Sequence, residues 1–174
     1  MSHAVLTHFV VSQLTEGIWH TVVYFNKVII VRPAQILRGS VVPAVVMIIV
    51  TCGEPEDIIM DTVKAAVYVD YPHDKLRIVV ADDGNSPSLR RDVTDLQASY
   101  PFLHYTSRSG GQGYKAGNLN TCLSSFVPSI GFNFDWICVL DADMIPAFGI
   151  LRSLLPHGVE KDEIGMVVTG QVSR

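Results

Sequence analysis

Residues 135–143 read Asp-Trp-Ile-Cys-Val-Leu-Asp-Ala-Asp, and this stretch decides how the chain folds. The run from Trp136 to Leu140 is short, uninterrupted and rich in β-branched and aromatic residues, which is typical of a strand buried on both faces of a parallel sheet. Two carboxylates follow it, where open α/β sheets bind their ligands. We therefore expect Asp141 and Asp143 to hold a divalent cation, Mg²⁺ or Mn²⁺, beside a diphosphate.

Paired acids also have an ordinary interpretation, a solvated turn in which Asp143 caps the next helix. Their place between an apolar run and the segment Met144-Ile145-Pro146 favours the metal site. The remaining chain should then supply the other parts of a diphosphate site.

Further apolar runs predict more strands of the same sheet, and helical patterns alternate with them. The predicted strands are Ala44–Val50, Leu76–Ala81, Phe102–Thr106 and Ile164–Thr169. The predicted helices run from Pro55 to Tyr71-Pro72, from Leu89 to Ala98 with Ser86 or Ser88 as cap, from Lys115 to Pro128, and from Pro146 to Leu155. This order indicates an α/β fold, a three-layer αβα Rossmann-like and mostly parallel sheet with helices on both faces.

Polar residues follow the other predicted strands at the same sheet edge. Thr51 and Glu54 follow the first strand. Asp82 and Asp83 follow the second, where a carboxylate can accept hydrogen bonds from a base or a ribose, although Asp-Gly is also ordinary turn chemistry. Lys115 lies after a glycine-rich segment at a helix start and is a candidate phosphate contact, with a plain exposed lysine as the alternative.

Composition, cysteine spacing and the absence of certain motifs argue against several other classes of protein. The chain has 174 residues, 48% of them hydrophobic, and a formal net charge of -4, so we expect no nucleic-acid partner. Its three cysteines, Cys52, Cys122 and Cys138, show neither a disulfide framework nor zinc-ligand spacing, which fits a reducing, cytoplasmic setting. P-loop, Gly-x-Gly-x-x-Gly and Gly-x-Ser-x-Gly patterns do not occur where their chemistry requires them.

Residues 1–42 show no motif, and we interpret them as an N-terminal extension or linker. We expect no signal peptide and no transmembrane helix, because the longest apolar stretch is interrupted by His20, Asn26 and Lys27. A membrane-proximal segment stays open as an alternative, given how apolar the first 50 residues are.

Four ordered motifs resemble glycosyltransferase family 2, particularly its cellulose-synthase-like and hyaluronan-synthase-like branch. They are Thr-Cys-Gly-Glu-Pro, Val-Val-Ala-Asp-Asp-Gly, Tyr-Lys-Ala-Gly-Asn-Leu-Asn and Val-Leu-Asp-Ala-Asp, spread over residues 43–171. The resemblance implies a GT-A fold, a UDP-sugar donor, a divalent cation and inversion at the anomeric carbon. It implies substrate binding by Thr51, Glu54, Asp82, Asp83, Lys115 and Asp141, and metal binding by Asp141 and Asp143.

The family's later motifs, a general-base Asp segment and Gln-x-x-Arg-Trp, are not found before Arg174. We therefore assign no catalytic residue and expect residues 43–174 to form a partial GT-A domain, the donor-binding half of an enzyme that extends a polysaccharide at the cytosolic face of a membrane. Two alternatives remain open. One is a non-catalytic nucleotide-binding or regulatory fragment, or a decayed remnant of such an enzyme. The other is a nucleotidyltransferase, which would be expected to show a Gly-rich basic loop where Thr51–Pro55 stands.

Overall fold

The computed structural model describes residues 35–108, 111–160 and 163–168, all within one compact unit, Gln35–Arg174. Most of the predicted N-terminal extension, residues 1–34, lies outside the described residues. Within the described part, no helix is long and apolar enough to cross a membrane.

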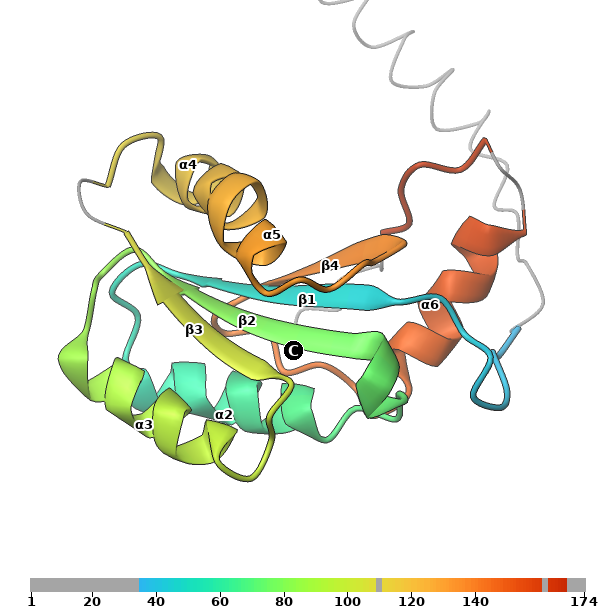
Figure 1. Cartoon of the computed structure of the whole chain (residues 1–174), viewed down its shortest axis with the longest axis horizontal. Helices are drawn as coiled ribbons and strands as arrows, with labels where there is room; N and C mark the ends of the chain where they lie inside the picture. Colours follow the sequence, from blue (N-terminus) through green and yellow to red (C-terminus); the bar gives the residue numbers. More distant parts are fainter. Residues whose placement is uncertain (1–34, 109–110, 161–162, 169–174) are drawn as a thin grey trace, which may run out of the picture. The chain divides into compact units, whose positions relative to one another are not determined.

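Four parallel strands form the sheet, in the order β3-β2-β1-β4 (Figure 1). Each matches a predicted strand to within one residue at either end. They are β1 (Val45–Thr51), β2 (Leu76–Asp82), β3 (Leu103–Ser107) and β4 (Trp136–Asp141).

The central strand is β1, and all seven of its residues are buried. Its side chains alternate between two apolar clusters, with Val45, Met47 and Ile49 facing one and Val46, Ile48 and Val50 facing the other. Full burial of each such side chain contributes about 1.5–3 kcal/mol, so this strand anchors the sheet.

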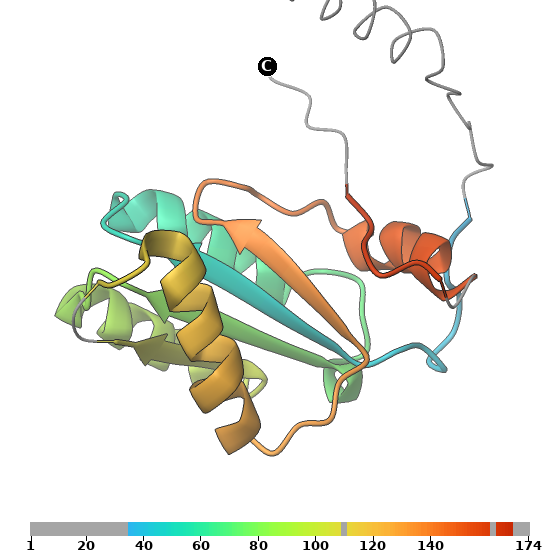
Figure 2. The same ribbon diagram turned by 90° about the horizontal axis from the view of Figure 1, so that it is seen from above.

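The strand at 136–141 is confirmed, but its predicted burial on both faces is wrong. Ile137 and Val139 stay 41% and 43% exposed, whereas Leu140 is buried. The reason is position: β4 pairs only with β1 in the described sheet, and the helical layer above β1 and β2 does not extend over it (Figure 2). An uninterrupted apolar run therefore marks β1 and β4 alike, although only β1 is enclosed.

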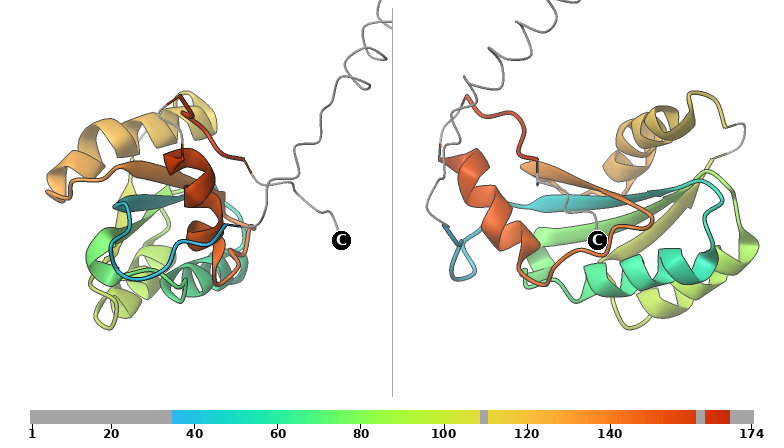
Figure 3. Two further views of the ribbon diagram at one scale, coloured as in Figure 1. Left: turned by 90° about the vertical axis from the view of Figure 1, so that its right-hand side faces the viewer. Right: turned by 180° about the vertical axis from the view of Figure 1, so that it is seen from behind.

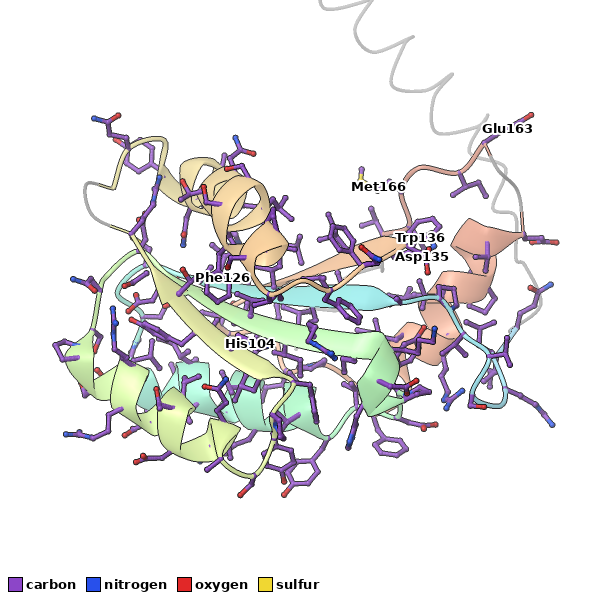
Figure 4. All side chains as sticks on the ribbon, in the orientation of Figure 1. His104, Phe126, Asp135, Trp136, Glu163 and Met166 are labelled. Carbon is purple, nitrogen blue, oxygen red and sulfur yellow. The ribbon has the colours of Figure 1, made fainter. Side chains whose placement is uncertain are left out.

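Helices cover the two faces of the sheet and give the predicted αβα layers (Figure 1). One face packs against α2 and α3 together with α6, and the other against a continuous helical segment formed by α4, a π-helical turn and α5. On this second face the His104 and Phe126 rings meet edge to face with centroids 6.3 Å apart (Figure 4). The bounds are α2 (Glu56–Val67), α3 (Pro87–Gln97), α4 (Tyr114–Thr121), the π-helical turn (Cys122–Phe126), α5 (Val127–Ser129) and α6 (Ile150–Val159), with a short 3₁₀ turn at His73–Lys75.

Two helices differ from the predictions by several residues. The α2 helix ends at Val67, before Tyr71-Pro72. The α6 helix begins at Ile150 rather than at Pro146, and it ends at Val159 rather than at Leu155. The helical segment that begins at Tyr114 ends at Ser129, one residue after Pro128, as predicted to within one residue. The cap of α3 is Ser86, whose Oγ accepts a hydrogen bond from the Leu89 amide at 3.3 Å.

The segment after α6 is not the predicted strand. Ile164–Val168 is irregular, and Thr169 lies outside the described residues. Figure 3 shows this segment following α6. Residues 35–42, assigned to the extension, belong to this unit instead: the Leu37 amide donates to the Arg152 carbonyl at 2.9 Å, and Val42 is buried.

Candidate functional site

The carboxyl ends of the strands meet at one edge of the sheet. Thr51 pairs with Asp82 in the β1–β2 register, and Val50 pairs with Asp141 in the β1–β4 register. Asp82 in turn pairs with Ser107 at the end of β3. All the residues predicted for the site therefore follow strand ends at this edge, apart from Lys115, which comes from the start of α4.

The turn after β1 is closed by Glu54. Its Oε2 accepts hydrogen bonds from Thr51 Oγ1 at 2.8 Å and from the Cys52 amide at 2.6 Å. Burial alone would raise the pKa of Glu54, but these hydrogen bonds and the charge of Lys115 outweigh it and hold the pKa below its ordinary value. Glu54 is therefore an exposed anion that closes the turn by accepting from Thr51 and Cys52.

Asp82 is buried, and protein groups already satisfy its carboxylate. Oδ1 accepts the Gly84 amide at 2.7 Å, and Oδ2 accepts the Ser86 amide and the Tyr105 hydroxyl, each at 2.7 Å. Desolvation and the nearby carboxylate raise the pKa of Tyr105 to about 12, so its hydroxyl remains a donor. This geometry favours the ordinary turn interpretation of Asp82 over a substrate contact.

Asp83 points to the opposite face, as alternation at a strand end requires. Its two oxygens accept from Arg108 Nε at 2.6 Å and Arg108 Nη2 at 2.9 Å, a bidentate pair with side chains only 2% and 12% exposed. Hydrogen bonds from Arg108 hold the pKa of Asp83 below its usual range. The Asp83 amide also donates to the Thr51 carbonyl at 2.9 Å.

Arg108 extends from this pair to the glycine-rich loop. Its Nη1 donates to the Gln112 carbonyl at 2.6 Å, and its Nη2 donates to the Tyr114 carbonyl at 3.0 Å. Gly113 adopts a positive φ of 75° without strain, but the φ of 50° at Tyr114 is uncommon for a residue other than glycine, and the hydrogen bond to its carbonyl supports it. One guanidinium thus joins the ends of β2 and β3 to the start of α4.

The first turn of α4 packs closely on this loop. A Cβ placed on Gly117 would lie 2.1 Å from the Gln112 carbonyl oxygen and 2.9 Å from Arg108 Nη1, so a glycine is required there. Asn118 is buried, and its Nδ2 donates to the Ala81 carbonyl at 2.7 Å. These contacts fix the helix that carries Lys115 against the sheet.

Lys115 reaches across the edge and forms an ion pair with Asp141 Oδ1, with side chains 51% and 44% exposed. Between the two acids, Ala142 is buried and its carbonyl accepts from Thr62 Oγ1 of α2 at 2.7 Å. This contact turns Ala142 inward. Asp143, the next residue, is exposed.

The donor set at this edge fits a divalent cation of the magnesium type. Among the described residues, no group of three or more His, Cys, Asp or Glu side chains could enclose a metal ion. Mg²⁺ commonly uses one or two carboxylates together with substrate phosphates and water, and Asp141 and Asp143 offer such a set. The cationic Lys115 on Asp141 shows that this oxygen already attracts positive charge.

A cavity among the described residues adjoins the predicted site only at Asp141. It has a volume of about 690 Å³, is lined largely by apolar side chains of β4, α6 and residues 165–168, and includes Trp136 and Met166 (Figure 4). Asp141 is its only residue in common with the predicted site. The predicted site is a polar surface at the strand ends rather than this cavity.

Sequence reasoning missed three of the residues that build the site: Arg108, Gly117 and Asn118. Gly117 and Asn118 belong to the Lys-Ala-Gly-Asn segment, and a basic residue directly before a glycine-rich loop was a usable signal for Arg108. The role of each of these three residues depends on which strand end or which carbonyl group it contacts in the folded protein. The spacing of residues along the chain does not reveal those contacts.

The Asp83–Arg108 pair predicts a pH dependence of stability. Because the pKa of Asp83 is lowered by folding, its contribution to the free energy of unfolding is complete above the ordinary aspartate pKa of about 3.9 and is lost as the pH falls through the lower folded value. We expect Arg108→Gln to flatten the acid limb of a urea-unfolding series between pH 6 and pH 2.5. Equal acid slopes in the two proteins would contradict this.

The chain is similar to several known proteins in sequence and in fold. The chain is 31% identical over 125 residues to the UDP-forming cellulose synthase catalytic subunit of Xanthomonas axonopodis pv. citri, covering 72% of this chain and 16% of that protein. The mannosyltransferase PcManGT of Pyrobaculum calidifontis, solved with GDP-Man and Mn²⁺, matches with a TM-score of 0.55 and 24% identity over 84% of this chain and 39% of that one. S. aureus TarS 1-349 matches with a TM-score of 0.50 and 16% identity over 62% of this chain and 30% of that one.

These structural likenesses confirm the expected GT-A-type Rossmann-like fold. The chain spans well under half the length of these relatives. Residues 43–174 match the family described as glycosyltransferase-like family 2. The chain therefore belongs to the glycosyltransferase-like family 2.

Proposed function

We propose that this chain is the donor-binding part of an inverting glycosyltransferase that transfers sugar from a UDP-sugar to a growing polysaccharide with the help of Mg²⁺ or Mn²⁺. The main observation behind the proposal is the ion pair between Lys115 and Asp141 at the strand ends, next to the exposed Asp143. A cation and two carboxylates at one sheet edge are the elements needed to hold a metal-bound diphosphate.

Each side chain has a role in this proposal. Asp141 and Asp143 would hold the cation, which neutralises charge on the departing diphosphate. Lys115 would contact the phosphates, while Thr51, Glu54 and Asp83 would face the nucleoside. Asp83 would be held in place for this contact by its bidentate pair with Arg108. We place Asp82 in the supporting structure, because its oxygens already accept three hydrogen bonds.

The choice of uridine follows from the curated relative, whose name describes it as UDP-forming. The mannosyltransferase solved with GDP-Man shares only 24% identity and supports the fold alone. The acceptor polysaccharide and attachment at the cytosolic face of a membrane are proposed from the cellulose synthase likeness. We assign no general base within residues 43–174.

Calorimetric titration of UDP and GDP, with and without Mn²⁺, tests the donor site. We expect UDP binding that requires Mn²⁺ and that Asp143→Ala weakens by about tenfold or more, because one of two carboxylate ligands is removed. Asp61→Ala, an exposed acid in the middle of α2, removes the same charge away from the site and should bind normally. Binding of UDP that is indifferent to Mn²⁺ and to Asp143 would refute the proposal.

A non-catalytic nucleotide-binding module is the alternative function. It predicts the same UDP binding but no chemistry with any acceptor. Transfer of labelled sugar from a UDP-sugar by the purified chain, lost in Asp143→Ala, would exclude this alternative.

A further inference from the structure

The cation at Asp141 in this structure is the ammonium of Lys115. The ion pair involves Oδ1 of an acid proposed as a metal ligand, and both side chains are about half exposed. Half-exposed pairs of this kind are weak and exchange readily, unlike the enclosed pair of Asp83 and Arg108. The ammonium therefore occupies one of the carboxylate oxygens that a divalent cation at Asp141 would use.

The backbone of Lys115 is held firmly while its side chain is not. Arg108 ties the carbonyls of Gln112 and Tyr114, the Gly117 amide donates to the Gly113 carbonyl at 2.8 Å, and Asn118 anchors the helix to β2. The lysine stem is flexible and ends in a compact point charge. Its ammonium can therefore move between nearby anions, Asp141 and Glu54 among them, without any change in the fold.

We propose that Lys115 is an exchangeable cation that links metal binding to diphosphate binding. With the site empty of ligand, it neutralises Asp141. When a divalent cation takes Asp141, the ammonium is released to the diphosphate of the bound nucleotide. The inference rests on the proposed function, and it makes Lys115 a competitor of the metal as well as a phosphate contact.

Opposite effects on the two ligands follow from this exchange. Removing the ammonium frees Asp141 and should strengthen binding of the metal alone, but it removes a phosphate contact and should weaken binding of the nucleotide. Metal and nucleotide should also favour each other by the same factor in either order of addition, since coupling between two binding sites is reciprocal. A lysine that only clamps phosphate would leave the affinity for metal alone unchanged.

The experiment titrates Mn²⁺ alone, followed by paramagnetic resonance of the free ion, and then UDP at saturating Mn²⁺, followed by calorimetry. For Lys115→Met we expect Mn²⁺ affinity to rise about two- to fivefold, the range that a half-exposed ion pair supports. We expect UDP affinity to fall about tenfold, as for the loss of a charge-assisted hydrogen bond to phosphate. The factor by which Mn²⁺ and UDP strengthen each other's binding should therefore be smaller in Lys115→Met than in the unchanged protein.

Lys64→Met is the matched control, because it removes one positive charge from an exposed position on α2. It should leave both affinities unchanged, and Lys115→Arg should retain most of the coupling. Unchanged or weaker Mn²⁺ binding by Lys115→Met overturns the exchange. If Asp143→Ala weakens Mn²⁺ binding in that case, the proposed metal site survives. If neither Mn²⁺ nor UDP binds to any of the proteins, both proposals fail.

Discussion

Asp82→Ala is expected to lower the free energy of unfolding by about 2–4 kcal/mol. The carboxylate is buried and accepts from two backbone amides and the Tyr105 hydroxyl, so its removal takes away three hydrogen bonds and leaves the hydroxyl only the Ser86 carbonyl at 3.5 Å. These donors shape the turn between β2 and α3. Urea unfolding monitored by circular dichroism measures the loss.

Two further variants make this prediction specific. Tyr105→Phe removes one of the three hydrogen bonds and should cost about 1 kcal/mol. Asp61→Ala, exposed on α2, should leave the free energy of unfolding nearly unchanged. If Asp82→Ala instead kept its stability and lost UDP affinity, Asp82 would be a substrate contact after all.

Gly117→Ala, which adds a single methyl group, is expected to disrupt the candidate site strongly. The added Cβ would lie 2.1 Å from the Gln112 carbonyl oxygen, so the loop carrying Gly113 and Tyr114 must shift and break its bonds to Arg108. We expect a loss of stability of about 1–3 kcal/mol, as for overpacking. UDP affinity at saturating Mn²⁺ should fall at least about tenfold, because a displacement near 1 Å at Lys115 is enough to break a phosphate contact.

The control is Gly149→Ala. Gly149 has an ordinary φ of -96° and no atoms within 4 Å of an added Cβ, so this variant should fold and bind normally. Normal UDP binding by Gly117→Ala would show that the loop does not position Lys115.

Local sequence patterns determined most of the fold. The apolar runs at 44–50, 76–81, 102–106 and 136–140 each correspond to a strand, because burying β-branched side chains in a sheet gives a signal that depends only on neighbouring residues. Because these strands alternate with helices, they were expected to run parallel to one another. The carboxyl ends of parallel strands lie at the same edge of the sheet, so that edge was expected as well. The positions of Thr51, Asp83, Lys115 and Asp141 at that edge followed directly.

Tertiary structure decided what each residue at the edge does. Asp82 and Asp83 are adjacent and chemically identical, yet one supports a turn and the other pairs with Arg108, since the pleat directs them to opposite faces. The runs in β1 and β4 are equally apolar, but strand order encloses only β1. Arg108 pairs with Asp83 and Asn118 donates to the Ala81 carbonyl, and both partners are distant in sequence, so these contacts exist only once the chain has folded.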